Sequence, residues 1–161
     1  TFYITLPFRV DPNPPKAESA KLEQAASIKG AHILLVEDNE LNMEISQYIL
    51  EGAGAIVAQA WNGKEAVRRF SESEPGTFDC ILMDVMMPLM DGLEATRTIR
   101  AMQRPDAATI PIVAMTANTF SEDEQRSREA GMNLFLNKPV DSGKMLQTVL
   151  ECLKMGGENA L

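Results

Sequence analysis

Five short apolar segments, each followed by a stretch with helix signals, constrain the fold of this chain more than any other feature. Strands are predicted at residues 33–36, 55–60, 78–83, 110–115 and 133–136. Because a helix separates each strand from the next, the strands can lie parallel in one sheet with helices on both faces. Right-handed crossovers then favour an α/β fold, a doubly wound five-stranded parallel sheet with five helices, for which we expect the strand order 2-1-3-4-5.

The intervening segments carry recognisable helix signals. Leu41, Ile45 and Ile49 lie at helical spacing within residues 40–52, and glycines close that segment. Asn62 and Asp91 are each followed three residues later by a glutamate, which is the pattern of a capped helix N-terminus. We therefore predict that Asp91 caps a helix and does not bind a metal.

The chain contains one folded domain with additional segments at both ends. Its 161 residues and 45% hydrophobic content suffice for one core. Residues 1–7 alternate as a short strand, and the proline-rich residues after them predict a linker over 8–30. The folded domain is expected over 31–155 and a C-terminal tail over 156–161. Since no initiator methionine is present, we interpret the chain as a fragment.

Charge and cysteine content narrow the function. Acidic residues outnumber basic ones by 23 to 15, which disfavours binding to nucleic acid. Cys80 and Cys152 fit neither a disulfide framework nor a metal-binding spacing, so we expect a reducing, cytoplasmic location. No signal peptide is visible, and no apolar run reaches the roughly 18 residues of a membrane span, so direct membrane contact is not expected.

Polar residues stand at the ends of four predicted strands. Glu37 and Asp38 follow the first strand, Asp84 the third and Thr116 the fourth, while Lys138 follows the fifth. Because the first and third strands are neighbours in the expected order, their three carboxylates converge. They repel each other unless a cation, a proton or Lys138 compensates. Carboxylate oxygens with room for water suit Mg²⁺.

These groups suffice for acceptance of a phosphoryl group. A carboxylate can attack phosphorus and form an acyl phosphate, while a metal and a fixed cation neutralise the incoming anion. The Thr116 hydroxyl and the backbone N–H of Ala117 can donate hydrogen bonds to phosphoryl oxygens, with the lysine on the opposite side. The methionines of the loop after the third strand, Met86, Met87 and Met90, are expected to pack beneath the site and not to bind metal.

Four short motifs occur in order along the chain: VEDNELN at 36–42, MDVMMPLMDG at 83–92, MTA at 115–117 and KP at 138–139. Over about residues 31–154 they resemble the receiver domain of response regulators, which have a flavodoxin-like fold. The resemblance implies that Asp84 is the phosphoacceptor. It also implies that Glu37, Asp38, Asp84 and the backbone carbonyl of Met86 hold Mg²⁺.

The resemblance implies further roles around the acceptor. Lys138 would contact the phosphoryl group, and its bond to Pro139 is expected to be cis. Met86 and Asn118 would border the route of hydrolytic water and set the phosphoryl lifetime. Glu37 stands where many members of the family carry aspartate, and its extra methylene should still permit Mg²⁺ binding through water.

The resemblance also implies a conformational switch and a partner. Thr116 would move onto the phosphoryl group and Phe135 would rotate into the vacated space, which repacks the face of the fourth helix, fifth strand and fifth helix. Phe135 lacks a hydroxyl, and a plain core role for it stays open. Since the only histidine, His32, precedes the first strand, we expect an external phosphohistidine donor, either a histidine kinase dimerisation domain or a histidine phosphotransfer protein. It would dock on the first helix and around Val140.

Residues 1–7 resemble the last strand of a sensor kinase's ATP-binding domain. A receiver after such a strand and a proline-rich linker implies that the parent is a hybrid sensor histidine kinase, with its attachment to a membrane left open. The fragment itself would catalyse only its own phosphorylation and dephosphorylation, and it would relay the phosphoryl group or tune its own kinase.

Three other functions were weighed against this one. A phosphohydrolase of the haloacid dehalogenase type needs a second aspartate two residues after the nucleophile, where this chain has Met86. A flavin-binding module would need a Ser/Thr-rich phosphate loop after the first strand, where the acidic residues 37–40 would repel phosphate. A receiver-like module that binds partners without being phosphorylated stays as the alternative, although its motifs would be expected to be degenerate.

Overall fold

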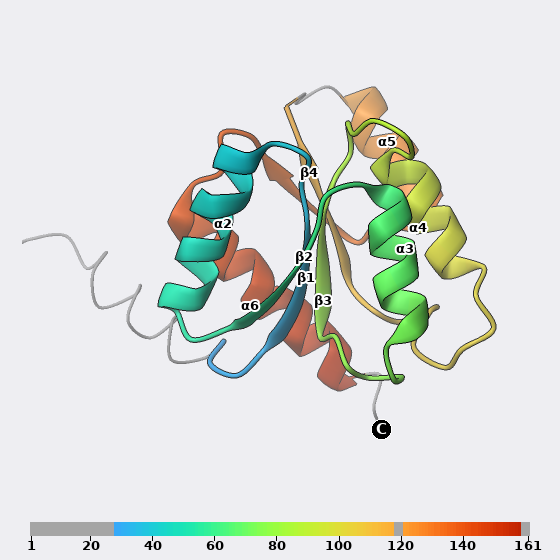
Figure 1. Ribbon diagram of the computed structural model, residues 1–161, viewed down its shortest axis with the longest axis horizontal. Coiled ribbons are helices and arrows are strands. Elements are labelled where there is room, and N and C mark those ends of the chain that lie inside the picture. The colour runs from blue at the N-terminus through green and yellow to red at the C-terminus, as the bar shows by residue number, and fades with distance from the viewer. Residues whose placement is uncertain (1–27, 118–120, 159–161) are drawn as a thin grey trace, which may run out of the picture.

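Strands and helices alternate along the part of the chain that the computed structural model describes, residues 28–117 and 121–158 (Figure 1). In chain order the elements are β1 (His32–Val36), α2 (Glu40–Gly52), β2 (Ile56–Ala60), α3 (Gly63–Glu72), β3 (Cys80–Asp84), α4 (Gly92–Arg100), β4 (Ile112–Thr116), α5 (Ser121–Ala130), β5 (Leu134–Asn137) and α6 (Ser142–Glu158). The predicted strand at 1–7 and most of the predicted linker lie outside the described residues. Helix α6 continues into the segment predicted as a tail.

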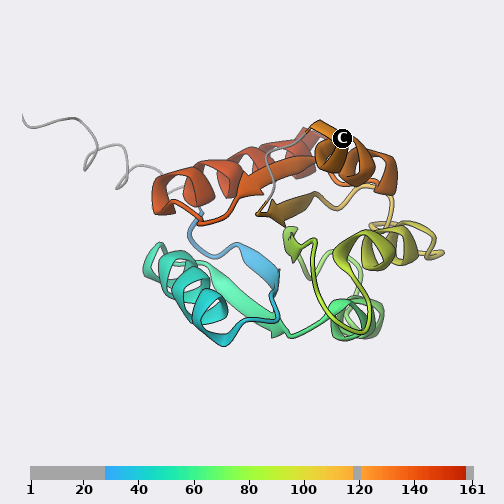
Figure 2. The ribbon, with the colours of Figure 1, turned by 90° about the horizontal axis from the view of Figure 1, so that it is seen from above.

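The five strands form one parallel sheet in the order β2-β1-β3-β4-β5, which confirms the predicted doubly wound fold. Helices α2 and α6 cover one face of the sheet, and α3, α4 and α5 cover the other (Figure 2). Strands β3 and β4 are buried along their whole length because both faces are covered. All strands end at the same edge, so the polar residues at their carboxyl ends share one side of the molecule.

Strands β3 and β4 each begin two residues later and end one residue later than the apolar pattern predicts. Asp84 and Thr116 are therefore the last residues of their strands and not the first residues of loops. The register pairs Asp84 with Met115 across the two strands, and this pairing cannot be read from either segment alone. Because both residues belong to the sheet, their side chains start from fixed positions at its edge.

Two predicted helix caps are present. Asn62 Oδ1 accepts a hydrogen bond from the backbone N–H of Glu65 at 2.9 Å, and Asp91 Oδ1 accepts one from that of Glu94 at 2.8 Å. Each cap satisfies an N–H that no carbonyl of the helix can reach. The Glu65 carboxylate in turn accepts from the backbone N–H of Trp61 at 3.0 Å, which fixes the turn from β2 into α3.

A half-buried arginine ties α4 to the turn after α5. The Arg100 guanidinium donates twice to the carbonyl of Gly131 at 3.0 and 2.9 Å, once to the carbonyl of Ala107 at 2.8 Å and once to Asn133 Oδ1 at 2.9 Å. Burial lowers the pKa of Arg100. The hydrogen bonds to neutral oxygens offset the cost of removing its charge from water.

Helix α2 is present where it was predicted, but of the three apolar residues that located it only Ile49 packs against the core. Leu41 is 63% exposed and Ile45 is 47% exposed, and Tyr48 is also on the surface. The residues that the helix buries are Met43, Ser46 and Leu50. The helix therefore presents to solvent an apolar stripe made of Leu41, Ile45 and Tyr48, called the α2 stripe below.

Candidate functional site

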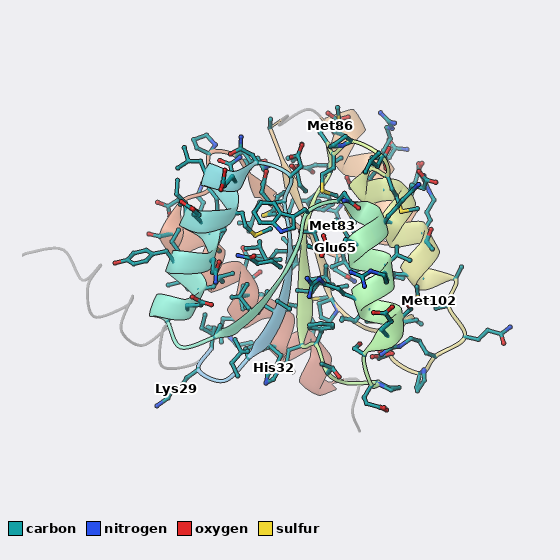
Figure 3. The ribbon with its side chains drawn as sticks, viewed as in Figure 1. Lys29, His32, Glu65, Met83, Met86 and Met102 are labelled. Carbon is teal, nitrogen blue, oxygen red and sulfur yellow. The ribbon has the colours of Figure 1, made fainter. Side chains whose placement is uncertain are left out.

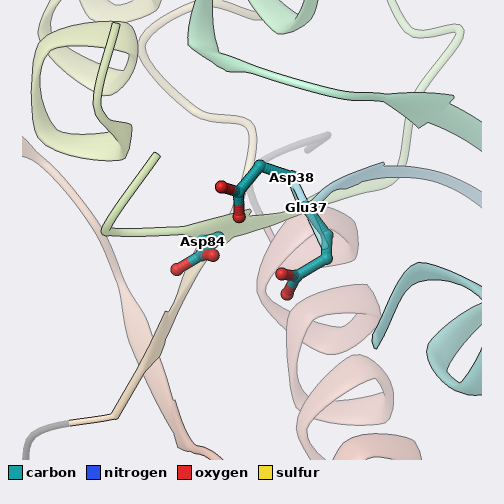
Figure 4. A group of neighbouring side chains, drawn as sticks. All are labelled: Glu37, Asp38 and Asp84. Atoms are coloured by element: carbon teal, nitrogen blue, oxygen red, sulfur yellow. The ribbon is translucent and has the colours of Figure 1, made fainter. Parts of the chain in front are cut away.

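Three carboxylates meet where β1 and β3 end. Glu37 and Asp38 directly follow β1, and Asp84 is the last residue of β3. One ligand oxygen from each lies within 4.8 Å of the others, and Figure 4 shows that the three side chains gather around one space. Glu37 and Asp84 are buried, whereas Asp38 is exposed. The convergence predicted from the strand order is confirmed.

Lys138 supplies the positive charge for two of these carboxylates. Its Nζ lies 2.6 Å from Glu37 Oε2 and 2.8 Å from Asp84 Oδ2. The lysine follows β5 directly, and its backbone N–H donates to the carbonyl of Thr116 at 2.8 Å. The bond between Lys138 and Pro139 is cis, as predicted. The amine thus bridges the residue after β1 to the last residue of β3.

Glu37 is held on both of its carboxylate oxygens. Oε2 binds Lys138, while Oε1 accepts from the backbone N–H of Asn39 and from Asn42 Nδ2, each at 3.3 Å. Asn39 also caps α2 by accepting from the backbone N–H of Asn42 at 3.0 Å. No role was predicted for Asn42 from the sequence. Its position in the first turn of the helix that follows the acidic pair is the signal that would have indicated one.

Asp84 and Met86 are joined by a short local contact. The backbone N–H of Met86 donates to Asp84 Oδ1 at 3.1 Å, so each carboxylate oxygen of Asp84 has a donor. The Met86 side chain is 76% exposed, which corrects the prediction that it packs beneath the site, while Met87 is buried in the core. Figure 3 shows Met86 at the opposite end of the molecule from His32, so His32 is remote from the Asp84–Met86 segment.

The surroundings of Asp84 make it an unusual carboxylate. Burial is the main cause that raises its pKa, the charge of Glu37 adds to this effect, and Lys138 opposes it without cancelling it. Burial would lower the pKa of Lys138, but hydrogen bonds to Asp84 and Glu37 outweigh burial and raise it. Charged Lys138 therefore lies beside Asp84, and the surroundings of Asp84 stabilise its ionised form poorly.

Two cavities open at the edge of the sheet where the strands end. A cavity of about 420 Å³ lies between the β3–α4 loop and α5, and its lining includes Met86, Thr116, Ala117 and Arg126. A second cavity of about 410 Å³ is lined in part by Glu37, Lys138 and Ala117. Because Ala117 borders both cavities, the end of β4 stands between them. Asn118, the second predicted lifetime residue, lies outside the described residues.

The donor groups fit a hard divalent cation. Carboxylate oxygens are the ligands that Mg²⁺ prefers, and the exposed Asp38 leaves space for the waters that Mg²⁺ retains. Asp38 can offer an oxygen directly. Both oxygens of Glu37 and both oxygens of Asp84 already accept hydrogen bonds, so each of these residues would bind an ion through water or by exchanging a donor.

Fold and site together define a class of protein: a doubly wound α/β domain with an acidic pair after β1, a buried aspartate at the end of β3 and a lysine after β5. The family model described as "Response regulator receiver domain" matches residues 33–150. The chain therefore belongs to the response regulator receiver family of two-component signalling systems.

Individual proteins of known sequence or structure agree with this membership. The chain is 34% identical over 158 residues to histidine kinase 1 of Arabidopsis thaliana and 40% identical over 142 residues to hybrid signal transduction histidine kinase B of Dictyostelium discoideum. Each match covers 80% of the chain but only 13% and 7% of those relatives, respectively. The chain thus corresponds to a small part of each relative and is homologous to the receivers of hybrid histidine kinases.

Solved structures show the same fold. The receiver domain of sensor histidine kinase PA1611 from Pseudomonas aeruginosa, with a magnesium ion coordinated in its active site cleft, is 35% identical with a TM-score of 0.70. That match covers 78% of the chain and 98% of the solved domain. Chemotaxis response regulator CheY4 of Vibrio cholerae is 29% identical with a TM-score of 0.71, and the match covers 78% of the chain and all of CheY4. Within the described ranges, no helix is both long and apolar enough to span a membrane.

Proposed function

We propose that this receiver accepts a phosphoryl group on Asp84 from a partner's phosphohistidine in a Mg²⁺-dependent reaction. The observation that carries the proposal is the setting of Asp84, a buried carboxylate bound on one oxygen by Lys138 and on the other by the Met86 N–H. Its raised pKa and its place beside Glu37 and Asp38 agree with this role.

The chemistry follows from the groups around Asp84. An Asp84 oxygen attacks phosphorus, the bond between phosphorus and the donor's imidazole nitrogen breaks, and the electron pair stays on the ring, which leaves an acyl phosphate. Mg²⁺ held by Asp38, Asp84 and the Met86 carbonyl, with Glu37 acting through water, would neutralise charge on the phosphoryl oxygens. Lys138 stays protonated and moves its hydrogen bond from the carboxylate to the phosphoryl group.

The response to phosphorylation would start at the end of β4. The Thr116 hydroxyl and the Ala117 N–H donate to phosphoryl oxygens, which draws Thr116 toward Asp84. Phe135 lies on the same face of the sheet as Thr116, because it is paired with Ala114, two residues before Thr116 in β4. Movement of Thr116 would let the Phe135 ring turn inward and repack the face made by α5, β5 and α6.

The α2 stripe is proposed as the docking face for the phosphohistidine donor, a helix bundle of a histidine kinase or a histidine phosphotransfer protein. Ile45 of the stripe and Val140 line the same cavity beside Lys138, so an apolar partner surface can pack there next to the acceptor. Ile45→Lys should slow transfer from the protein donor and leave phosphorylation by acetyl phosphate unchanged. Equal effects on both reactions would contradict this placement.

The parent protein is proposed to be a hybrid sensor histidine kinase, with this receiver on the cytoplasmic side. The relatives named above support the kinase, and the reducing setting inferred from free Cys80 and Cys152 supports the location. Under this proposal the chain catalyses no reaction on other molecules. It accepts the phosphoryl group, changes conformation and loses the group by hydrolysis or onward transfer.

The proposal is tested by the intact mass of the protein after incubation with acetyl phosphate and Mg²⁺. The wild type should gain one phosphoryl group, and Asp84→Asn or removal of Mg²⁺ with EDTA should abolish the gain. Asp79→Asn, which changes an exposed aspartate next to the start of β3, is the matched control and should behave as wild type. An equal gain in Asp84→Asn would contradict the proposal. No gain in the wild type, with acetyl phosphate or with its kinase, would favour an unphosphorylated interaction module.

A further inference from the structure

The Phe135 ring has a cationic neighbour that the receiver motifs do not contain. Arg128 projects from α5, and its guanidinium carbon lies 4.8 Å from the centroid of the Phe135 ring on β5. Within the described part of the chain, no carboxylate forms an ion pair with Arg128. Its charge is therefore directed at the negative face of the ring, which is a cation–π contact.

Arg128 contacts the Phe135 ring in the position that the ring has in this structure, and we expect the contact to be lost if the ring turns. Phe135 is half-buried, and it packs against the edge of the core cluster that α3, α4 and α5 form with the sheet. Directly across in β4 lies Ala114, a fully buried residue with a side chain of one methyl group. Thr116 follows two residues later on the same face. A ring that turned toward Thr116 would pass over Ala114, away from the solvent-facing α5 surface where Arg128 lies.

We propose that Arg128 is a positioning residue that holds Phe135 in its present half-buried position beside α5, called outward below, and so opposes the conformational switch. This inference rests on the proposed function, because it assigns a restraint to the same site. Phosphorylation of Asp84 favours the inward ring, and the Arg128 contact favours the outward ring. In the unphosphorylated protein only the contact acts, and it lowers the fraction that already has the switched conformation.

The expected size follows from the strength of an exposed cation–π contact. The contact is present in only one of the two conformations, so its free energy sets the factor by which it changes the ratio of their populations. For an exposed cation–π pair that factor is about two- to five-fold. By linkage, a ligand that binds the inward state gains affinity when the contact is removed, and by no more than the same factor. The contact thus shifts the conformational equilibrium modestly and does not prevent the switch.

The test measures binding of beryllofluoride, a phosphoryl mimic, in the presence of Mg²⁺. Arg128→Met removes the charge and keeps an apolar stem, and it should tighten beryllofluoride binding about two- to five-fold. The NMR shift of the Ala114 methyl group, which faces the ring, should move toward its bound value before the mimic is added. Arg128→Lys keeps a cation and should stay near wild type. Arg97→Met, an equal charge loss on the exposed side of α4, is the matched control.

A double mutant tests whether the effect of Arg128→Met acts through the Phe135 ring. In a Phe135→Leu background, Arg128→Met should change affinity by less than the measurement error, because the partner of the cation is absent. Unchanged affinity in Arg128→Met, the same gain in Arg97→Met, or a gain that persists with Phe135→Leu would each overturn the inference. If the wild type fails to bind beryllofluoride and also fails to gain a phosphoryl group, the proposed function falls and this inference falls with it.

Discussion

Replacement of Lys138 by methionine removes the only cation that contacts the buried carboxylates among the described residues. Lys138 makes charged hydrogen bonds to Glu37 at 2.6 Å and to Asp84 at 2.8 Å, and methionine keeps most of the stem without the charge. The variant leaves two carboxylates facing each other in a site that burial already makes unfavourable for anions. We expect the folded protein to be less stable at neutral pH in the absence of metal.

The size of this loss can be worked from the contacts. A hydrogen bond to a charged group contributes about 1.5–3 kcal/mol, so two such bonds set an upper range of about 3–6 kcal/mol. The lysine no longer has to be desolvated, and its side chain is 18% exposed, so water reaches the site and reduces the loss. We expect the free energy of unfolding to fall by about 2–3 kcal/mol.

The loss should depend on pH in a defined direction. Burial raises the pKa of Asp84 even with Lys138 present, and removal of the lysine raises it further. A carboxyl group with a raised pKa in the folded state costs stability when it is ionised, and this cost disappears as the pH falls through that pKa. The difference between Lys138→Met and wild type should therefore shrink as the pH falls from neutrality toward the raised pKa of Asp84.

Urea unfolding in EDTA at neutral and at mildly acidic pH measures both effects. Addition of Glu37→Gln to Lys138→Met removes one of the two negative charges that repel each other, and it should restore part of the stability at neutral pH. Lys154→Met, which removes an exposed charge from α6, is the matched control. A loss below about 0.5 kcal/mol, which is within the range of ordinary surface substitutions, or a loss equal at both pH values, would refute the reasoning.

Three further predictions concern stability. Arg100→Ala should lower the free energy of unfolding by about 2–3 kcal/mol, because it removes the donors of part-buried carbonyl groups. Exposed Arg97→Ala on the same helix should change it by no more than about 0.5 kcal/mol in urea unfolding. Exposed Leu89 has φ 70°, so Leu89→Gly should raise stability by roughly 0.5–1 kcal/mol and β-branched Leu89→Val should lower it, which the urea midpoints would show. Asn62→Ala should cost about 1 kcal/mol and Asn62→Gly only a few tenths, and equal losses on thermal unfolding would contradict its capping role.

Local sequence signals sufficed for the fold and for much of the site. Apolar runs located the five strands, and the caps at Asn62 and Asp91 were visible as spacings because a cap involves residues only three positions apart. The rule that parallel strands end at one edge then brought Asp84 to Glu37, although 47 positions separate them in the sequence. The proximity of Asp84 and Glu37 was thus predicted from a general rule of sheet topology, because neither segment alone indicates it.

Strand bounds and exposed faces could not be predicted in the same way. Asp84 and Thr116 are strand residues because of their partners in the sheet, which an apolar pattern does not identify. Periodicity showed that residues 40–52 form a helix, but an apolar stripe on the surface has the same spacing as one in the core, so the exposure of Leu41 was missed. Met86 was misplaced because its N–H binds Asp84 while its side chain faces solvent.

Contacts that long side chains make between separate elements left no sequence signal. Arg100 reaches a carbonyl 31 residues away, and Arg128 reaches the ring of Phe135 on the next strand. Such contacts depend on how the helices cover the sheet, which is decided only after the elements are packed. They explain why the motifs predicted the acceptor and its charged neighbours but gave no indication of the contact that holds the proposed switch residue.

The central claim is that Asp84 itself becomes the acyl phosphate. Borohydride reduces an acyl phosphate to an alcohol and so converts a phosphorylated aspartate to homoserine, which a peptide mass spectrum locates. After phosphorylation with acetyl phosphate and Mg²⁺, the account predicts homoserine at position 84 and unmodified Glu37 and Asp38. Reduction at either of those two neighbours with an intact Asp84, or at no residue of a protein shown to carry the phosphoryl group, would contradict it.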